Sequence, residues 1–192
     1  TLAANQNHVE AQNNLGYLYS SDLFPRDMNK SIYYYTLAVN QNHLIAQFNL
    51  GLLYERGELI PRDMEKSIYY FTLAANQNFV EAQHHLGCVY DKGVLIPRDI
   101  NKCIKYYTLA ANQNFTEAQF NLGKLYMTDN SIPRDNNKCI HYISLAANQN
   151  HAESQLFLGY LYQEGEIIPR DINKCIHYYS LAANQNNAEA QF

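Results

Sequence analysis

A repeat of about 36 residues constrains this sequence more than any other feature. The hexapeptide LAANQN, or its variant LAVNQN, begins at six leucines spaced by 35, 36, 36, 36 and 36 residues: Leu2, Leu37, Leu73, Leu109, Leu145 and Leu181. The tripeptide PRD recurs every 36 residues from Pro25 to Pro169. Periods of this size are typical of arrays in which each unit packs on its neighbours. We therefore expect one repeat array over residues 1–192, with a partial unit at 1–36, complete units at 37–72, 73–108, 109–144 and 145–180, and a partial unit at 181–192.

Each unit carries the signals of two helices, which we term helix A and helix B. In the first unit Ala11, Leu15 and Tyr19 recur every four residues, which predicts one apolar stripe on a helix A over about residues 8–20. Apolar residues at three- and four-residue steps predict a helix B over about Met64–Asn76. Only one or two residues separate helix B from the next helix A, and such short links favour antiparallel neighbours. The expected fold is all-α, a right-handed α/α solenoid of stacked antiparallel helix pairs.

Short polar motifs mark where these helices begin and end. Asn7, followed three residues later by Glu10, forms an Asn-x-x-Glu pattern that predicts capping of helix A by the asparagine. The aspartate of each PRD is a good N-cap for helix B. The last asparagine of AANQN is expected to take the left-handed conformation that commonly ends a helix.

Glycines occupy two repeated positions. Five of them lie in the middle of helix A, where glycine costs about 1 kcal/mol relative to alanine, so their recurrence predicts close contact with another helix. They are Gly16, Gly51, Gly87, Gly123 and Gly159. A second set, Gly57, Gly93 and Gly165, is placed to end helix A in the left-handed conformation. Asp22 and Asp129 replace this glycine in two units, which predicts more strained turns there.

The four cysteines do not suggest a disulfide framework. Three of them share one position of helix B, which holds serine in the earlier units, and this indicates a slot for a small side chain: Cys103, Cys139 and Cys175. Equivalent positions on stacked units should lie on the order of 10 Å apart, too far for a disulfide. Cys88 lies separately on a helix A. Free thiols favour a reducing compartment, so a cytoplasmic location is expected.

Composition excludes several classes of function. No apolar stretch approaches the roughly 20 residues that would span a membrane. A net charge of -4 argues against a surface for nucleic-acid phosphates. No signal peptide is visible at Thr1, and the sequence starts and stops inside a unit, so we expect a fragment of a longer chain.

No catalytic, metal or cofactor site is expected. The sequence contains no Gly-rich phosphate loop and no recurring Ser, His and acid motif. His84 and His85 are adjacent and therefore point to different sides of a helix, and no close set of Cys and His ligands accompanies them. The candidate nucleophile Cys103 is explained by the repeat. We expect a protein that is not an enzyme.

The repeat resembles a known family. Its pattern A-x-x-x-L-G-x-x-Y-x-x-G, followed by I-P-R-D-x-x-K-[small]-x-x-Y-Y-x-x-A-A, is similar to the Sel1-like repeat, an α/α solenoid related to tetratricopeptide repeats, over almost the whole chain. The tryptophan usual in that family's helix B is tyrosine here, and its glycine between units is asparagine. The resemblance implies a scaffold or adaptor that assembles protein complexes, with some relatives in membrane-linked protein quality control and others in signalling.

Two related repeat families fit less well. Tetratricopeptide repeats have a period of about 34 residues and lack the I-P-R-D loop. Pentatricopeptide repeats bind RNA and should carry a basic groove. The related solenoids place helix A on the concave side, and this sets where a partner is expected.

Variable positions on helix A form the candidate partner-binding surface. At about 100° of rotation per residue, three rows of helix A positions lie opposite the apolar stripe that repeats in each unit. The residues of these three rows differ from unit to unit. The partner-binding residues predicted on this concave face are Phe48, His84, Phe120 and Leu156 in the first row, Leu52, Cys88, Lys124 and Tyr160 in the second row, and Glu55, Asp91, Met127 and Gln163 in the third row. Such a groove suits an extended or helical peptide. The alternative is that Phe48, Phe120 and Leu156 pack against the next helix A.

The function expected from these observations is a protein interaction scaffold without cofactors. One alternative is a structural segment that self-associates end to end. Another is a non-catalytic regulatory region of a larger signalling or protein-quality-control protein.

Overall fold

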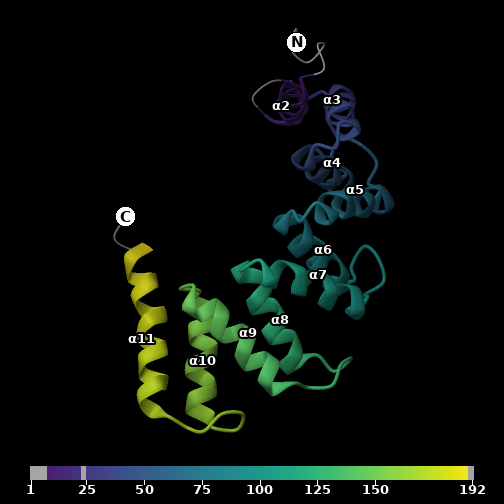
Figure 1. Ribbon diagram of the computed structural model, residues 1–192. Helices are drawn as coiled ribbons and strands as arrows, with labels where there is room; N and C mark the ends of the chain where they lie inside the picture. The colour runs from purple at the N-terminus through teal and green to yellow at the C-terminus, as the bar shows by residue number, and fades with distance from the viewer. Residues whose placement is uncertain (1–7, 23–24, 190–192) are drawn as a thin grey trace. The chain divides into compact units, whose positions relative to one another are not determined.

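The computed structural model describes residues 8–22 and 25–189, with side chains through Gln185 (Figure 1). These residues form ten helices and no strand. The helices are α2 (Val9–Ser20), α3 (Met28–Asn40), α4 (Leu44–Arg56), α5 (Met64–Asn76), α6 (Val80–Lys92), α7 (Ile100–Asn112), α8 (Thr116–Thr128), α9 (Asn136–Asn148), α10 (Ala152–Glu164) and α11 (Ile172–Glu189). The expected all-α architecture is confirmed.

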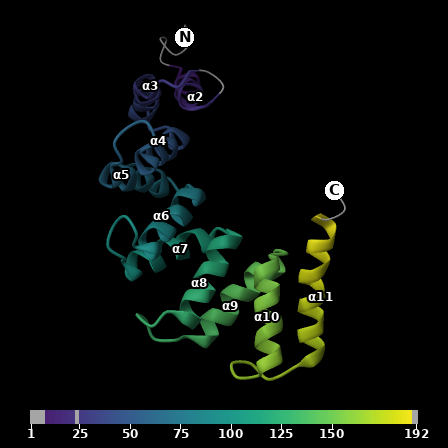
Figure 2. The same ribbon diagram turned by 180° about the vertical axis from the view of Figure 1, so that it is seen from behind.

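The chain divides into two compact units, Thr1–Asp99 and Ile100–Phe192. In unit 1, α2 packs on α3 and α4 on α5, and each pair also contacts the helix that follows it. In unit 2, α8 packs on α9 and α10 on α11, with α7 against α8 and α9 against α10. Both views show successive helices lying side by side within each unit, joined alternately by short and long links (Figures 1 and 2). Helix A of each repeat is an even-numbered helix and helix B is an odd-numbered one.

The core of each unit lies where the apolar stripes of helices A and B meet. In unit 1 the buried cluster consists of Tyr35, Ala38, Ala46 and Leu50. In unit 2 it consists of Cys139, Ile143, Ala147, Leu158 and Leu161. The alanine and leucine of the repeated A-x-x-x-L motif supply Ala46 and Leu50, as the four-residue periodicity predicts.

The mid-helix glycines permit the close contact that was predicted for them. A Cβ atom added at Gly51 would lie 2.7 Å from the ring of Phe71 on α5, closer than packed atoms approach. At Gly16 the same test places the added Cβ 2.6 Å from the ring of Tyr35 on α3. The large side chain of helix B therefore rests directly on the backbone of helix A.

The slot for a small side chain is also confirmed. Ser31 is fully buried and its hydroxyl donates to the carbonyl of Gly16 at 2.8 Å. Ser67 occupies the same slot in the next repeat, where its buried hydroxyl has no hydrogen-bond partner. The cysteines that fill the slot in later repeats are buried, and neither they nor Cys88 form a disulfide bond: Cys103, Cys139 and Cys175.

The helix ends follow the sequence in most repeats. The side chain of Asp63 accepts the backbone N–H of Lys66 at 3.0 Å, so the PRD aspartate caps helix B as predicted. The last asparagine of each internal AANQN motif is left-handed, with φ between 61° and 66°: Asn42, Asn78, Asn114 and Asn150. The glycines predicted to end helix A are left-handed as well: Gly57, Gly93 and Gly165.

Three predictions about helix ends were wrong. In the last repeat Asn186 does not end helix B, because α11 continues as one helix to Glu189. Asn7 lies outside the described residues, but in the later repeats helix A is not capped by the asparagine, because Asn42, Asn78, Asn114 and Asn150 already end the preceding helix B in a left-handed conformation. The next residue takes the N-cap, and in α4 the Nδ1 atom of His43 accepts the N–H of Ala46 at 3.1 Å. The strain expected at Asp129 is absent, because α8 ends there with an extended backbone at φ -84°. Likewise α2 ends at Ser21 in an extended conformation, before Asp22.

In four repeats a tyrosine of helix A stacks on a tyrosine of helix B. The rings of Tyr54 and Tyr70 stack with centroids 5.9 Å apart. The ammonium group of Lys66 lies 5.0 Å from the Tyr54 ring and 3.1 Å from the carboxylate of Asp63. Similar stacks recur in α2–α3, α8–α9 and α10–α11. The tyrosine that replaces the family's tryptophan therefore serves packing between the two helices of a repeat.

Candidate protein-binding surface

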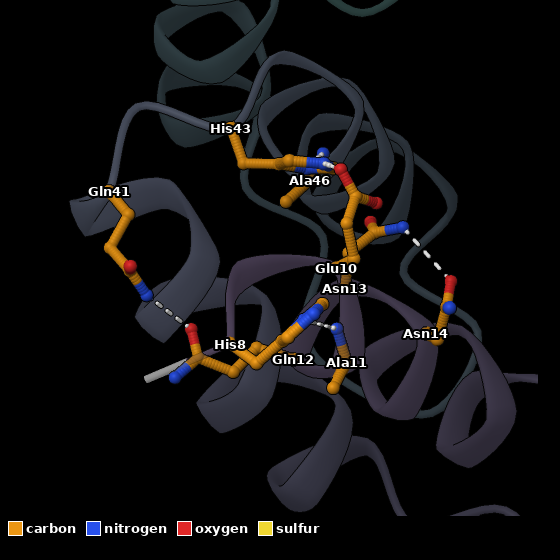
Figure 3. A network of polar contacts seen from close by, with 9 residues as sticks. All are labelled: His8, Glu10, Ala11, Gln12, Asn13, Asn14, Gln41, His43 and Ala46. Carbon is orange, nitrogen blue, oxygen red and sulfur yellow. Dashed lines mark hydrogen bonds and ion pairs between the residues drawn. The ribbon is translucent and has the colours of Figure 1, made fainter. Parts of the chain in front are cut away.

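Buried glutamines separate framework from surface on helix A. Gln47 is 2% exposed, and its Oε1 atom accepts a hydrogen bond of 2.7 Å from Gln77 at the end of the following helix B. The pair Gln12 and Gln41 has the same 2.7 Å geometry (Figure 3). These residues were not among the predicted functional positions, although a glutamine stands at the same helix A position in every unit.

The glutamines also connect each repeat to the preceding one. Gln83 on α6 donates to the carbonyl of Ala75 on α5 at 3.1 Å. In unit 2, Gln119 and Gln155 donate in the same way to the carbonyls of Ala111 and Ala147, each at 3.2 Å. A carbonyl near the C-terminal end of a helix B is thereby satisfied by the next helix A, as buried backbone groups require. These residues belong to the framework and are not available to a partner.

The first predicted row is largely buried between helices. Phe48 is half-buried, with its ring centroid 5.3 Å from both Phe71 and Phe79 and 5.9 Å from His85. Phe120 packs on the core cluster of unit 2, with its ring 4.9 Å from the imidazole of His151. His84 is half-buried as well.

Leu156 is the exception in that row, because 46% of its surface is exposed. It is the member of the first row that is most open to a partner.

The second row is the most accessible. Lys124 is exposed and Tyr160 is 47% exposed. Tyr17, at the equivalent position of α2, is 56% exposed. Leu52 and Cys88 are half-buried, and the Cys88 sulfur lies 3.5 Å from Nε2 of His84.

The third row makes contacts within the protein. The carboxylate of Glu55 lies 2.8 Å from Nε2 of His85, and this hydrogen bond lowers the pKa of Glu55 despite its partial burial. Asp91 pairs with Arg98 at 2.8 Å. Met127 packs on the core cluster of unit 2. Gln163 is exposed and accepts a hydrogen bond from the Tyr179 hydroxyl at 3.1 Å.

The third-row contacts follow a rule that the sequence analysis missed. In three repeats the third-row residue, the large side chain of its own helix B and a residue of the next helix A come together. Glu55 and His85 form a hydrogen-bonded pair beside the ring of Phe71, with the rings of Phe71 and His85 4.5 Å apart. Met127, Ile143 and Phe157 form an apolar set. A signal existed in the sequence, because the three positions change character together from repeat to repeat.

At Tyr35, the contact between a third-row residue, the large side chain of helix B and a residue of the next helix A is polar. The Tyr35 hydroxyl hydrogen-bonds with Ser20 and Asn49, while burial raises the pKa of Tyr35 to about 12. Ser20 is a third-row residue of α2, and Asn49 lies on the next helix A, α4. The third row therefore fixes how neighbouring helices fit and contributes little exposed surface.

Among the residues that the structure describes, no group of three His, Cys, Asp or Glu side chains could hold a metal ion. A cavity of about 80 Å³ lies beside Glu55, His85, Cys88 and Lys92. None of the described helices has the length and apolar character needed to cross a membrane.

The repeat identifies the family. The model of the Sel1 repeat matches residues 9–43, 44–79, 80–115, 116–151 and 152–187. The chain belongs to the Sel1 repeat family. Each matched segment starts at the first residue of a helix A, from Val9 in α2 to Ala152 in α10. Sel1 repeat proteins generally act as scaffolds for protein–protein interactions and are generally not catalytic.

Solved structures agree with this assignment. A protective antigen present in uropathogenic Escherichia coli strains, which displays an SLR fold, superposes with a TM-score of 0.88 at 28% identity and is matched over 99% of this chain. This Sel1 repeat chain spans only 41% of that antigen. A Sel1 repeat protein from Oxalobacter formigenes gives a TM-score of 0.78 at 30% identity, over 96% of this chain and 74% of its own.

A more distant match shows the fold alone. An immunity protein from Pseudomonas aeruginosa has a TM-score of 0.54 at 19% identity, over 95% of this chain and 70% of its own. No curated protein matches the Sel1 repeat chain.

Proposed function

We propose that this chain is a non-enzymatic scaffold that binds a peptide or protein partner on the helix A surface. One observation carries the proposal. On helix A, the residues that are identical in the described repeats are buried or half-buried, as at Gln47, Leu50, Gly51 and Tyr54, whereas the residues of the three predicted rows differ between repeats. A binding surface needs such differences, because each unit then contributes its own contacts.

The exposed residues of this surface carry the binding role. In unit 2 they are Lys124, Leu156 and Tyr160, and in unit 1 Tyr17 is equally open. Leu52, His84 and Cys88 add half-buried surface in unit 1. Tyrosine is enriched among residues that dominate binding energy, because it offers a rigid apolar ring and a polar tip.

The remaining predicted residues support the surface from below. Phe48, Phe120 and Met127 are packed against neighbouring helices, and Glu55 and Asp91 are paired within the chain. Alanine at these positions would disturb the fold together with the surface, so they are poor sites for testing binding.

The test compares two exposed surfaces on the same protein. The double variant L156S/Y160S changes the helix A surface, and Y33S/Y69S changes exposed tyrosines of helix B that are each 58% exposed. Partners captured from a lysate by the wild-type chain and identified by mass spectrometry should be lost with L156S/Y160S and retained with Y33S/Y69S. Thermal unfolding of both variants should match wild type. Equal capture by L156S/Y160S and wild type would contradict the proposed surface.

A second candidate is end-to-end self-association, and α11 favours it. Ile172 and Ile176 are 53% and 59% exposed. Ile140, which corresponds to Ile176 in the preceding repeat, is packed against the core cluster of unit 2. A concentration series followed by light scattering tests this candidate, with I176K as the variant that should restore a monomer. A constant monomer mass for the wild-type chain over the whole series would eliminate it.

The setting of the scaffold follows from composition. The four free cysteines support a reducing compartment such as the cytoplasm. The net charge of -4 supports a protein partner rather than a nucleic acid. Within a longer protein, this chain would serve as a non-catalytic regulatory region, for example in signalling or protein quality control.

A further inference from the structure

The charges of the helix A surface are unequally compensated. Three of the predicted partner-binding residues carry a full charge at neutral pH: Glu55, Asp91 and Lys124. The carboxylate of Glu55 is bonded to His85 and that of Asp91 to Arg98, each at 2.8 Å. Lys124 is exposed and forms no ion pair within the described part of the chain. Lys124 is therefore the one of these three residues whose charged group can meet a partner without giving up a contact within the described part of the chain.

Two large apolar side chains share the helix A surface of unit 2 with Lys124. Lys124 on α8 and Tyr160 on α10 occupy equivalent positions of successive A helices. Leu156 lies one helical turn from Tyr160 on α10, and both are nearly half exposed. Phe120 and Phe157 join α8 and α10 to the same core cluster, so the two helices form one continuous support.

Acidic residues lie at both ends of the patch formed by Lys124, Leu156 and Tyr160. Glu117 and Glu153 lie in the first turns of α8 and α10, and Glu164 ends α10. All three are exposed. They repel a carboxylate that approaches the ends of the patch, whereas Lys124 attracts one at its middle. The charge pattern thus favours a single position for an acidic group.

We infer that this patch of unit 2 binds a peptide segment in which a carboxylate side chain stands next to a large apolar side chain. The apolar side chain packs on Leu156 and Tyr160, and the carboxylate pairs with Lys124. A nucleic-acid phosphate backbone is a poorer fit, because its binding requires several clustered cations. The inference rests on the proposed function and specifies the chemistry of the partner.

The experiment uses three fluorescent nonapeptides that differ at one position. Each has a central Leu-X-Phe sequence, where X is Asp, Asn or Lys, and binding to the full chain is followed by anisotropy. The wild-type chain should bind the Asp peptide about two- to fivefold more tightly than the Asn peptide, as expected for an exposed ion pair. The preference should shrink as ionic strength rises. The variant K124E should prefer the Lys peptide.

A matched control separates local from global electrostatics. Lys105 on α7 is also exposed in unit 2 but lies on a helix B, next to the ring of Tyr106. The variant K105E changes the net charge by the same amount as K124E and should keep the preference for the Asp peptide. An unchanged preference in K124E, a reversal in K105E, or no binding of the Asp peptide at millimolar concentration would each overturn the inference.

Failure of this inference is distinguishable from failure of the proposed function. If L156S/Y160S weakens all three peptides equally but K124E has no effect on preference, the surface binds peptides without selecting a carboxylate. If the Asp peptide binds L156S/Y160S as tightly as wild type, the peptide lies elsewhere and both proposals are wrong.

Discussion

The side-chain amide of Gln77 donates to the side-chain oxygen of Gln47 at 2.7 Å, and the same bond joins four helix A and helix B pairs of this chain. The glutamine on helix A is fully buried or nearly so, and its own amide reaches back to the preceding repeat. One side chain thus connects three successive helices. This arrangement explains why glutamine, usually a surface residue, is retained inside the solenoid.

Replacing either glutamine of this pair should lower the unfolding free energy. Replacing the second glutamine as well should add less to that loss than the same replacement costs in the wild-type chain. The variant Q47M keeps the volume of the side chain but leaves Gln77 and Asn42 without their partner, so we expect a loss of about 1–3 kcal/mol in unfolding free energy. In Q47M/Q77M the mutual bond is absent from both residues. Urea unfolding of the two single variants and the double variant should give a coupling energy of about 1 kcal/mol. If the losses of unfolding free energy in the two single variants add up to the loss in the double variant, the hydrogen bond between the two side chains makes no contribution of its own.

A mid-helix glycine should resist replacement by alanine. In an open helix the change Gly51→Ala would stabilise by about 1 kcal/mol. Here the new methyl group would lie 2.7 Å from the Phe71 ring, and overpacking of this kind costs about 1–3 kcal/mol. We expect lower unfolding free energy in G51A and partial recovery in G51A/F71L, where the smaller side chain makes room. A G51A chain as stable as wild type would mean that Phe71 moves freely.

The repeat itself made the helix positions predictable. Features that depend on one residue type, such as the left-handed Asn42 or the capping Asp63, were predictable because asparagine and aspartate have strong local preferences. The role of His43 was not, because histidine is an uncommon cap and its position becomes an N-cap only once Asn42 has ended the previous helix.

Contacts between repeats were less predictable than the helices. Phe48 stands at a variable position, which suggested a partner-binding role, yet its ring lies among Phe71, Phe79 and His85. Whether such a side chain turns outward depends on the size of its neighbours on two other helices. Leu156, at the equivalent position, is exposed. Sequence periodicity predicts which face of helix A carries a residue, but it does not predict whether the side chain is buried or exposed.

The two serines of the small slot should respond in opposite ways. Ser31 donates a hydrogen bond to Gly16, so S31A should lower the unfolding free energy by about 1 kcal/mol. The hydroxyl of Ser67 is buried without a partner, so S67A should be neutral or stabilising. The change S67C should also be tolerated, because cysteine fills this slot in three later repeats. Denaturant midpoints of the three variants provide the measurement, and equal losses in S31A and S67A would contradict the difference in bonding.

The cysteines should differ in reactivity in the folded protein. Cys88 is half-buried and is the most accessible of the four, whereas Cys103, Cys139 and Cys175 are buried. Burial raises the pKa of Cys139 to about 11, so only about one thiol in a thousand would be ionised there at pH 8. A thiol reagent should therefore modify one cysteine quickly and the others only as the chain unfolds. Peptide mapping should place the fast label on Cys88, and a fast label on Cys139 would show that unit 2 opens in the native state.

Acid should weaken the repeats through their aspartate caps. The backbone N–H of Lys66 lowers the pKa of Asp63, and the equivalent contacts lower the pKa of Asp27 and Asp135. A carboxylate with a lowered folded-state pKa stabilises the fold at pH values above its unfolded pKa of about 3.9, and this contribution is lost as pH falls through the lower folded value. The contribution of these aspartate caps to the unfolding free energy should therefore be constant near neutral pH and should decline below about pH 4. In D63N the amide oxygen still accepts the N–H but no longer titrates, so the difference in melting temperature from wild type should narrow as pH falls from 5 to 2. A constant difference over that range would show that Asp63 is not held as a carboxylate by its cap.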